Sequence, residues 1–311
     1  MDDPSAQLVP EAVNLQGPQN ELGFGPIQFN ERATWKIEVR GRESTAVKRL
    51  SGTSEGLDPD QVRWKGESDN VYFFKRREMC DVVLTILGTD IRITDEVRLN
   101  RVPLFKGVLV GDFEDPELPN ANNPLIPRGE FNSFFDVNGT DEEIASGVYP
   151  DVLPSDVVPD LPIPVQGDGY IYLNGKDDAA APDPFFIGGF NNTALNFGLQ
   201  DRPLNEIYLN FYAHSNGNRS TNLIVELTGI GGDMFRDEKQ VIWSGWRKIS
   251  VRLSEFVLFE SGQLGPNVIF PQQLTQLAFQ IHSGGGMPGN EAEICIDYIV
   301  FTYGSPFKQE K

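Results

Sequence analysis

Short runs in which apolar and polar residues alternate recur along the whole chain. Residues 33–39 place Trp35, Ile37 and Val39 on one parity and charged residues on the other, which is typical of a strand with one buried and one solvated face. Similar runs occupy residues 80–87, 91–94, 207–213, 223–227, 246–253 and 274–281. No segment shows an apolar period of about 3.6 residues, and the many glycines and prolines suit frequent turns. The pattern predicts an all-β protein.

A length of 311 residues predicts two domains. The β-rich runs of residues 23–104 suggest a small β-sandwich, and its segments 64–70 and 80–85 resemble those of Ig-like or PKD-like spacer modules. Residues 1–22 are polar and contain Pro, Asn and Gln, so we predict a flexible tether there. The tail of an ordinary protein is the alternative.

The second half opens with an acidic strand at residues 109–115 and closes with an apolar strand at 294–301. Together with the alternating runs between them, residues 107–303 resemble the galactose-binding-like jelly rolls used as carbohydrate-binding modules. The resemblance implies a larger jelly-roll β-sandwich over residues 105–306, followed by a short tail at 307–311. Residues 115–167 are rich in Pro, Asn, Asp and Gly and are predicted to form a long loop or a lid.

Charge and cysteine content narrow the range of partners. The net charge of −19 makes nucleic acids, anionic lipids and polyanionic glycans poor partners, because long-range repulsion opposes each encounter. No run approaches the roughly 18 to 20 uninterrupted apolar residues of a membrane helix. Cys80 and Cys295 lie in different halves of the chain, and neither has a Cys or His nearby in the sequence at metal-ligand spacing. We predict that both are small buried residues and that the ligand is neutral.

Two of the predicted strands carry polar side chains suited to sugars. Tyrosine rings stack on the apolar C–H face of a sugar, and amides and imidazoles form hydrogen bonds with its hydroxyls. If the strands at 207–213 and 274–281 are neighbours, their polar parities form one predicted patch of Tyr208, Asn210, Tyr212, His214, Gln280 and His282. The alternative is that each row is only the solvated face of a sandwich.

Residues 241–248 add two tryptophans to the candidates. Trp243 and Trp246 lie in a segment that resembles the Gly-Trp-Lys strand entry of carbohydrate-binding jelly rolls, where the second tryptophan is packed inside. The resemblance implies that Trp246 belongs to the core, which leaves Trp243 as the candidate for an exposed sugar platform. The phenylalanines at 134, 135, 185 and 186 are further candidates, although burial is the commoner fate of Phe.

A calcium site is also expected at the ends of the second domain. In related jelly rolls, carboxylates from the first and last strands hold a structural calcium, and Asp112, Glu114 and Asp297 occupy the matching places here. Hard oxygen ligands of this kind suit calcium. The resemblance therefore implies that these three residues hold the ion.

Signals of catalysis are few. A paired acid and base of a glycosidase cannot be assigned. Residues 280–282, Gln-Ile-His, resemble the Gln-Ile-His strand of jelly-roll alginate lyases, where a His and a Tyr move the proton of an elimination. The Arg-x-Glu-Leu-Arg and Tyr-Phe-Lys-Ala-Gly strands of that family are absent. A polysaccharide lyase or hydrolase that uses His282 is therefore kept as an alternative to a non-catalytic protein.

Taken together, the chain resembles the surface glycan-binding lipoproteins of Bacteroidota, which capture polysaccharide beside an outer-membrane importer. The resemblance implies a neutral glycan as ligand, an importer complex as a possible partner, and the cell surface as the location. The polar start of the chain fits a lipoprotein from which the signal has been removed. A structural adhesin or spacer without affinity for sugars is the other alternative.

Overall fold

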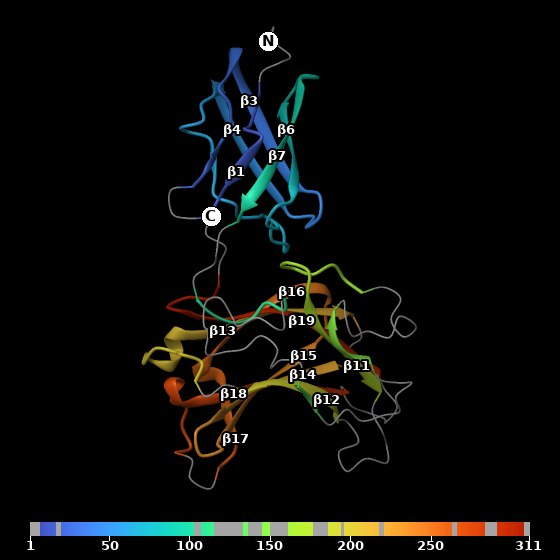
Figure 1. Ribbon diagram of the computed structural model, residues 1–311, viewed down its shortest axis with the longest axis vertical. Helices are drawn as coiled ribbons and strands as arrows, with labels where there is room; N and C mark the ends of the chain where they lie inside the picture. The colour runs from blue at the N-terminus through green and yellow to red at the C-terminus, as the bar shows by residue number, and fades with distance from the viewer. Residues whose placement is uncertain are drawn as a thin grey trace. The chain divides into compact units, whose positions relative to one another are not determined.

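The computed structural model describes residues 7–16, 20–102, 107–114, 133–135, 145–149, 161–176, 186–193, 196–217, 221–262, 266–283 and 291–307. The chain forms two compact units (Figure 1). The first consists of residues 1–105, 165–167 and 308–311, and the second of residues 106–164 and 168–307. In the described part of the chain, no helix is both long enough and apolar enough to span a membrane.

The first unit is built on a five-stranded sheet. Its strand order is β1-β7-β6-β3-β4, and a short two-stranded sheet joins β2 to β5. The strands are β1 (Ala12–Asn14), β2 (Leu22–Gly23), β3 (Ile27–Gly41), β4 (Val47–Leu57), β5 (Arg63–Trp64), β6 (Met79–Ile86) and β7 (Arg92–Arg101). The predicted parity of β3 is confirmed, because Trp35, Ile37 and Val39 are buried. The Ig-like or PKD-like assignment of this unit remains a prediction.

The start of the chain is part of this unit as far as it is described. Leu8, Val9 and Leu15 are buried in its core, and β1 pairs in parallel with β7. The backbone N–H groups of Leu8 and Val9 donate to Asp95 Oδ2 at 2.9 and 3.1 Å. The predicted flexible tether over residues 1–22 therefore does not hold for this stretch, because its apolar residues lie in the core of the first unit.

Two sheets form the second unit and confirm the all-β prediction. The front sheet, as we name it, has the order β10-β11-β19-β13-β16, with β8 also paired to β19; the back sheet has the order β17-β15-β14-β18-β12-β9. The front strands are β8 (Val108–Gly111), β10 (Ala145–Tyr149), β11 (Tyr170–Lys176), β13 (Ile207–Asn216), β16 (Ser244–Arg252) and β19 (Glu291–Tyr303). The back strands are β9 (Ser133–Phe135), β12 (Phe186–Thr193), β14 (Thr221–Gly229), β15 (Met234–Val241), β17 (Val257–Glu260) and β18 (Leu274–Ser283).

The main core of the second unit fills the space between the two sheets, which form two layers in Figure 1. Leu209 and Phe211 enter it from the front sheet, and Leu277 and Phe279 enter it from the back sheet. The Phe211 and Phe279 rings meet edge-on with centroids 5.0 Å apart. Both strands thus direct their apolar parity to the same core, as the alternating pattern predicts.

The outer face of the front sheet is also largely buried. Strands β13 and β19 are buried at nearly every position. Part of the cover comes from the end of the chain, where Phe307 is 3% exposed and packs against Tyr298, with ring centroids 5.7 Å apart. The predicted tail at 307–311 therefore begins one residue too early, because Phe307 belongs to the packed structure of this unit.

Candidate ligand-binding face of the second unit

Strand register collects aromatic and polar side chains on the outer face of the front sheet. Residues directly opposite one another in antiparallel strands share a face. The pairing places Tyr172, Cys295, His214 and Trp246 in one row across β11, β19, β13 and β16. On one side of this row, Asp297, Tyr212 and Lys248 are paired across β19, β13 and β16. On the other side, Asn174 pairs with Glu293, and the Asn216 amide bonds to Glu293.

Trp246 makes ring contacts with two neighbours on this face. The Trp246 indole meets the Tyr170 ring at 5.6 Å and the His214 ring at 5.4 Å between centroids, edge-on in both cases. Its Nε1–H donates to the carbonyl oxygen of Ile163 at 2.8 Å. Leu161 packs against the cluster of Tyr170, Tyr172 and Cys295. Trp246 therefore lies on the outer face, in contrast to its predicted place in the core.

Exposure changes along this face. Tyr170, Tyr172, Tyr212 and Asp297 are buried, so a ligand cannot reach them unless cover is displaced. At the other end the face opens to solvent, with half-buried side chains next to the exposed Asn216. We call this end the open patch, and it consists of Asn174, His214, Asn216, Trp246 and Glu293.

The ionisable groups of the open patch are shifted by burial. Burial lowers the pKa of His214, which favours the neutral imidazole near pH 7. Burial raises the pKa of Glu293, and the hydrogen bond that Asn216 Nδ2 donates to Glu293 Oε2 at 3.2 Å opposes this shift. The patch therefore presents a neutral imidazole, an indole, two amides and a carboxyl group.

The other three residues predicted to contact sugar on β13, Tyr208, Asn210 and Tyr212, are held within the protein. The Tyr208 hydroxyl accepts a hydrogen bond from Arg252 Nε at 3.1 Å, and Tyr212 is 6% exposed. Asn210 is 1% exposed, and its Oδ1 accepts from Ser250 Oγ and from the Phe307 N–H, each at 2.8 Å. Of the four residues predicted on this strand, only His214 reaches the open patch.

Gln280 and His282 lie away from the other predicted residues. Strand β18 belongs to the back sheet, so its polar parity faces the opposite side of the sandwich from that of β13. Gln280 Nε2 donates to Glu226 Oε2 at 3.3 Å, and the His282 ring meets Phe186 edge-on at 5.3 Å. The prediction of one patch across both strands is wrong, because β13 and β18 belong to opposite sheets and pack on the same core from its two sides, so their polar side chains point outward in opposite directions.

Trp243 does not form an exposed platform. It is half-buried and packs against the main core, its Nε1–H donates to the carbonyl oxygen of Ala213 at 3.3 Å, and the Arg247 guanidinium carbon lies 5.1 Å from its ring centroid. Strand β16 begins after Trp243, at Ser244. The phenylalanines predicted as further candidates at 134, 135 and 185 have side chains outside the described residues.

The predicted calcium ligands lie where β8 pairs with β19: Asp112 and Glu114 follow β8, and Asp297 is on β19. Asp297 is fully buried. Glu114 accepts hydrogen bonds from the N–H groups of Asp168 at 2.9 Å and Gly169 at 3.4 Å. Burial raises the pKa of Glu114 to about 7, and the nearby Asp112 and Asp168 carboxylates add to the shift. The calcium site itself remains a prediction.

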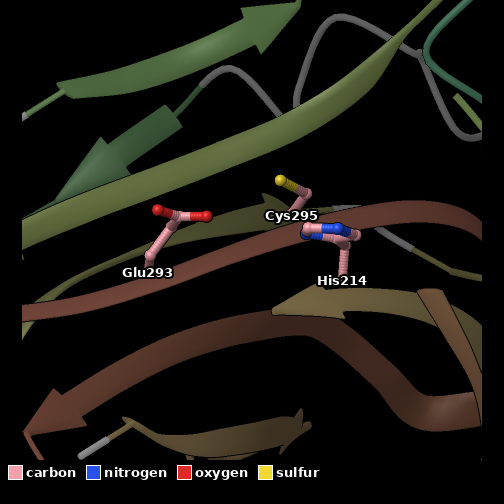
Figure 2. Close-up of side chains that lie close together, drawn as sticks. All are labelled: His214, Glu293 and Cys295. Carbon is pink, nitrogen blue, oxygen red and sulfur yellow. The ribbon is translucent and has the colours of Figure 1, made fainter. Parts of the chain in front are cut away.

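Another set of metal-ligating side chains does come together within the described residues. His214, Glu293 and Cys295 have donor atoms within 4.8 Å of one another (Figure 2). Sequence reasoning overlooked this cluster because Cys295 has no histidine close to it along the chain. It also overlooked Tyr170 and Tyr172, although the alternation of Tyr170, Ile171, Tyr172 and Leu173 carries the period of a strand.

Comparison with known proteins gives only distant similarities. No protein-family model matches the chain, and no curated protein matches it. A structure of carbohydrate-binding modules from the β-sandwich superfamily is 12% identical, with 96% of this chain and 99% of that chain covered and a TM-score of 0.36. SGBP-B, from a complex xyloglucan utilization locus in Bacteroides uniformis, is 14% identical, with 96% and 71% covered and a TM-score of 0.37.

A third structure covers only part of this chain. The family 11 carbohydrate-binding module of a cellulosomal cellulase of Clostridium thermocellum is 10% identical, with 56% of this chain and 88% of that chain covered and a TM-score of 0.33. At identities of 10–14% and TM-scores of 0.33–0.37, these similarities assign neither a family nor a function to the chain.

Proposed function

We propose that the second unit binds a neutral polysaccharide or oligosaccharide without catalysing a reaction, and that the open patch contacts the sugar. The observation that carries the proposal is the placement of the Trp246 indole beside His214, Asn216 and Glu293 on one accessible sheet face. An indole offers a flat apolar surface for the C–H face of a sugar ring, and the amides, imidazole and carboxyl group can form hydrogen bonds with its hydroxyls.

Charge favours a neutral glycan over an acidic one. The chain carries a net charge of −19, and the open patch contains Glu293 but no Lys or Arg. A polyanionic chain would meet repulsion both at long range and at the patch itself. Each hydroxyl of a neutral sugar gives up hydrogen bonds to water when it bonds to the protein, so the net gain in free energy is small. We therefore expect modest affinity at each site.

The lyase or hydrolase alternative depends on His282, which lies on the back sheet. Tyr208 and Tyr212 lie on the front sheet and face the opposite side of the sandwich, so neither can serve as the tyrosine partner of His282. This alternative predicts that the purified protein shortens a polysaccharide and that His282→Ala abolishes the activity. Unchanged chain lengths across a broad panel of polysaccharides would remove it.

The cellular setting is part of the same proposal. We place the protein at the cell surface, as an outer-membrane lipoprotein near a glycan importer, with the first unit as a spacer. This placement follows the sequence resemblance to surface glycan-binding lipoproteins. Labelling of intact cells with a membrane-impermeant reagent tests this placement. Labelling of the protein only after the cells are lysed would contradict it.

Affinity electrophoresis tests the glycan proposal directly. The wild-type chain, Trp246→Ala and His282→Ala are run through gels that contain neutral β-glucans, xylans, mannans, α-glucans or fructans. We expect retardation of the wild type in at least one gel, and a loss of about tenfold in affinity for Trp246→Ala, which corresponds to about 1.4 kcal/mol of stacking and packing. His282→Ala is the matched control, because its ring lies on the opposite outer face.

The possible outcomes separate the alternatives. Retardation that survives in Trp246→Ala but disappears in His282→Ala would move the site to the back sheet. Retardation in no gel would reject glycan binding and favour a structural adhesin or spacer. Because Trp246 also contacts Tyr170 and Ile163, Trp246→Phe, which keeps an aromatic ring, shows whether any loss comes from the ring or from disturbed packing.

A further inference from the structure

The cluster of His214, Glu293 and Cys295 has the geometry of a metal site. His214 and Cys295 are directly opposite each other on β13 and β19. Glu293 precedes Cys295 by two residues on the same strand, so it lies on the same face. Figure 2 shows the three side chains gathered on one side of these strands, with donor atoms within 4.8 Å of one another.

The donor set fits zinc better than it fits calcium or magnesium. Thiolate sulfur, imidazole nitrogen and carboxylate oxygen are the three ligand types that zinc accepts, and a soft thiolate disfavours the hard cations. Donors around a tetrahedral zinc lie roughly 3.5 Å apart, given bonds of about 2.0–2.3 Å. Small side-chain rotations of Glu293 and His214 would bring the cluster to that spacing, since both are only half-buried.

The surroundings of the cluster support a bound cation. Cys295 is fully buried, and His214 Nδ1 is buried and finds no hydrogen-bond partner among the described residues. Such an unpaired nitrogen costs free energy unless it gains a partner. Asn216 Nδ2 holds Glu293 Oε2 at 3.2 Å, which is the kind of supporting contact that orients a carboxylate ligand.

We propose that His214, Glu293 and Cys295 form a zinc site on the outer face of the front sheet, with the fourth position of the ion left to water. The site does not depend on the proposed glycan binding, because its ligands are defined by strand register and donor chemistry alone. Zinc bound by three residues on two strands would also fix β13 and β19 to each other.

Cobalt(II) provides a spectroscopic test, because a cobalt–thiolate bond gives a charge-transfer band in the near ultraviolet. The full chain is stripped with a chelator, kept reduced and titrated with cobalt, and zinc is then added in competition. We expect the band in the wild type and in Cys80→Ser, and its loss in Cys295→Ser. Cys80 is the matched control, because it is equally buried but lies in the first unit. A band that is absent from the wild type, or retained in Cys295→Ser, would overturn the proposal.

Two further variants keep the test decisive if Cys295→Ser disturbs folding. Glu293→Gln removes a half-exposed ligand, and Asn216→Ala removes its supporting hydrogen bond. We expect Asn216→Ala to weaken zinc binding roughly 10- to 100-fold and Glu293→Gln to weaken it at least as much. His282→Gln, which alters the other histidine of the chain, should leave it unchanged. Equal zinc affinity in all of these variants would overturn the site.

The metal and glycan proposals can fail separately. Zinc and cobalt binding are measured without any glycan, and gel retardation is measured with a chelator present. Metal binding without retardation would leave the zinc site standing and reject glycan binding. Retardation without metal binding would support glycan binding and reject the zinc site.

Discussion

Asn210 offers a sharp test of whether the outer face of the front sheet is structural at this point or open to ligands. The residue was predicted to contact sugar, but its amide is buried and bonded on both sides. Oδ1 accepts from Ser250 Oγ and the Phe307 N–H, each at 2.8 Å. Nδ2 donates to Thr302 Oγ1 at 3.0 Å, Tyr208 O at 3.1 Å and Val300 O at 3.2 Å. The Asn210→Ala substitution removes all of these bonds at once.

The expected cost follows from the number of bonds that can exist together. The two Nδ2 hydrogens serve three acceptors, so about four good bonds are lost. At roughly 1 kcal/mol net per bond, Asn210→Ala should lose about 3–4 kcal/mol. For a unit of this size that is a fall in Tm of about 6–16 °C. Differential scanning calorimetry of the full chain measures it as a shift of one transition.

A second buried amide supplies the control. Gln280 is 7% exposed and was also predicted to contact sugar. Unlike Asn210, it makes a single, longer side-chain hydrogen bond, to Glu226 Oε2 at 3.3 Å. Gln280→Ala should therefore cost only about 1 kcal/mol. If Asn210→Ala costs no more than Gln280→Ala, or if it abolishes glycan retardation while Tm is unchanged, the structural role assigned to Asn210 is refuted.

Two further predictions concern the second unit. Burial raises the pKa of Glu114 to about 7 from 4.5, so the folded chain binds this proton more tightly than the unfolded chain does, and stability should fall as pH rises from about 4.5 to about 7. In calcium-free buffer Glu114→Gln should remove roughly 1–3 kcal/mol of that fall, and an unchanged slope of unfolding free energy against pH would contradict this. A Cβ at Gly262 would collide with the carbonyl oxygen of Gly231, so Gly262→Ala should lower Tm by the equivalent of about 2–3 kcal/mol. Gly245→Ala, at φ +82° but in open space, should cost about 1 kcal/mol, and equal losses in the two variants would refute the steric argument.

The strands of the second unit could be predicted from the sequence because the alternation of apolar and polar residues is a local pattern. Alternation at 207–213 and 274–281 corresponds to β13 (Ile207–Asn216) and β18 (Leu274–Ser283). The apolar parity of each strand was also predicted correctly, since Phe211 and Phe279 meet in the core. A period of two requires only knowledge of neighbours along the chain, and that is why these elements were found.

The site was harder to predict because it depends on which strands pair. Nothing in the alternation of β13 or β18 states which sheet each strand joins, and the same pattern fits either choice. The assignment of both polar rows to one patch failed at this step. Alternation also says nothing about what covers the polar side, and here Phe307, at the far end of the chain, bonds to Asn210 and buries it.

The same dependence on pairing explains why Cys295 escaped notice. Metal motifs are recognised in sequences when their ligands share a turn, a hairpin or a helix face, so that the spacing is short and fixed. His214 and Cys295 are brought together only because β13 and β19 are neighbours in register, and shifting that register by one residue would direct Cys295 to the other face. A non-local contact of this kind is visible only in the folded chain. The front sheet therefore holds its reactive groups where strand pairing, and no sequence motif, has placed them.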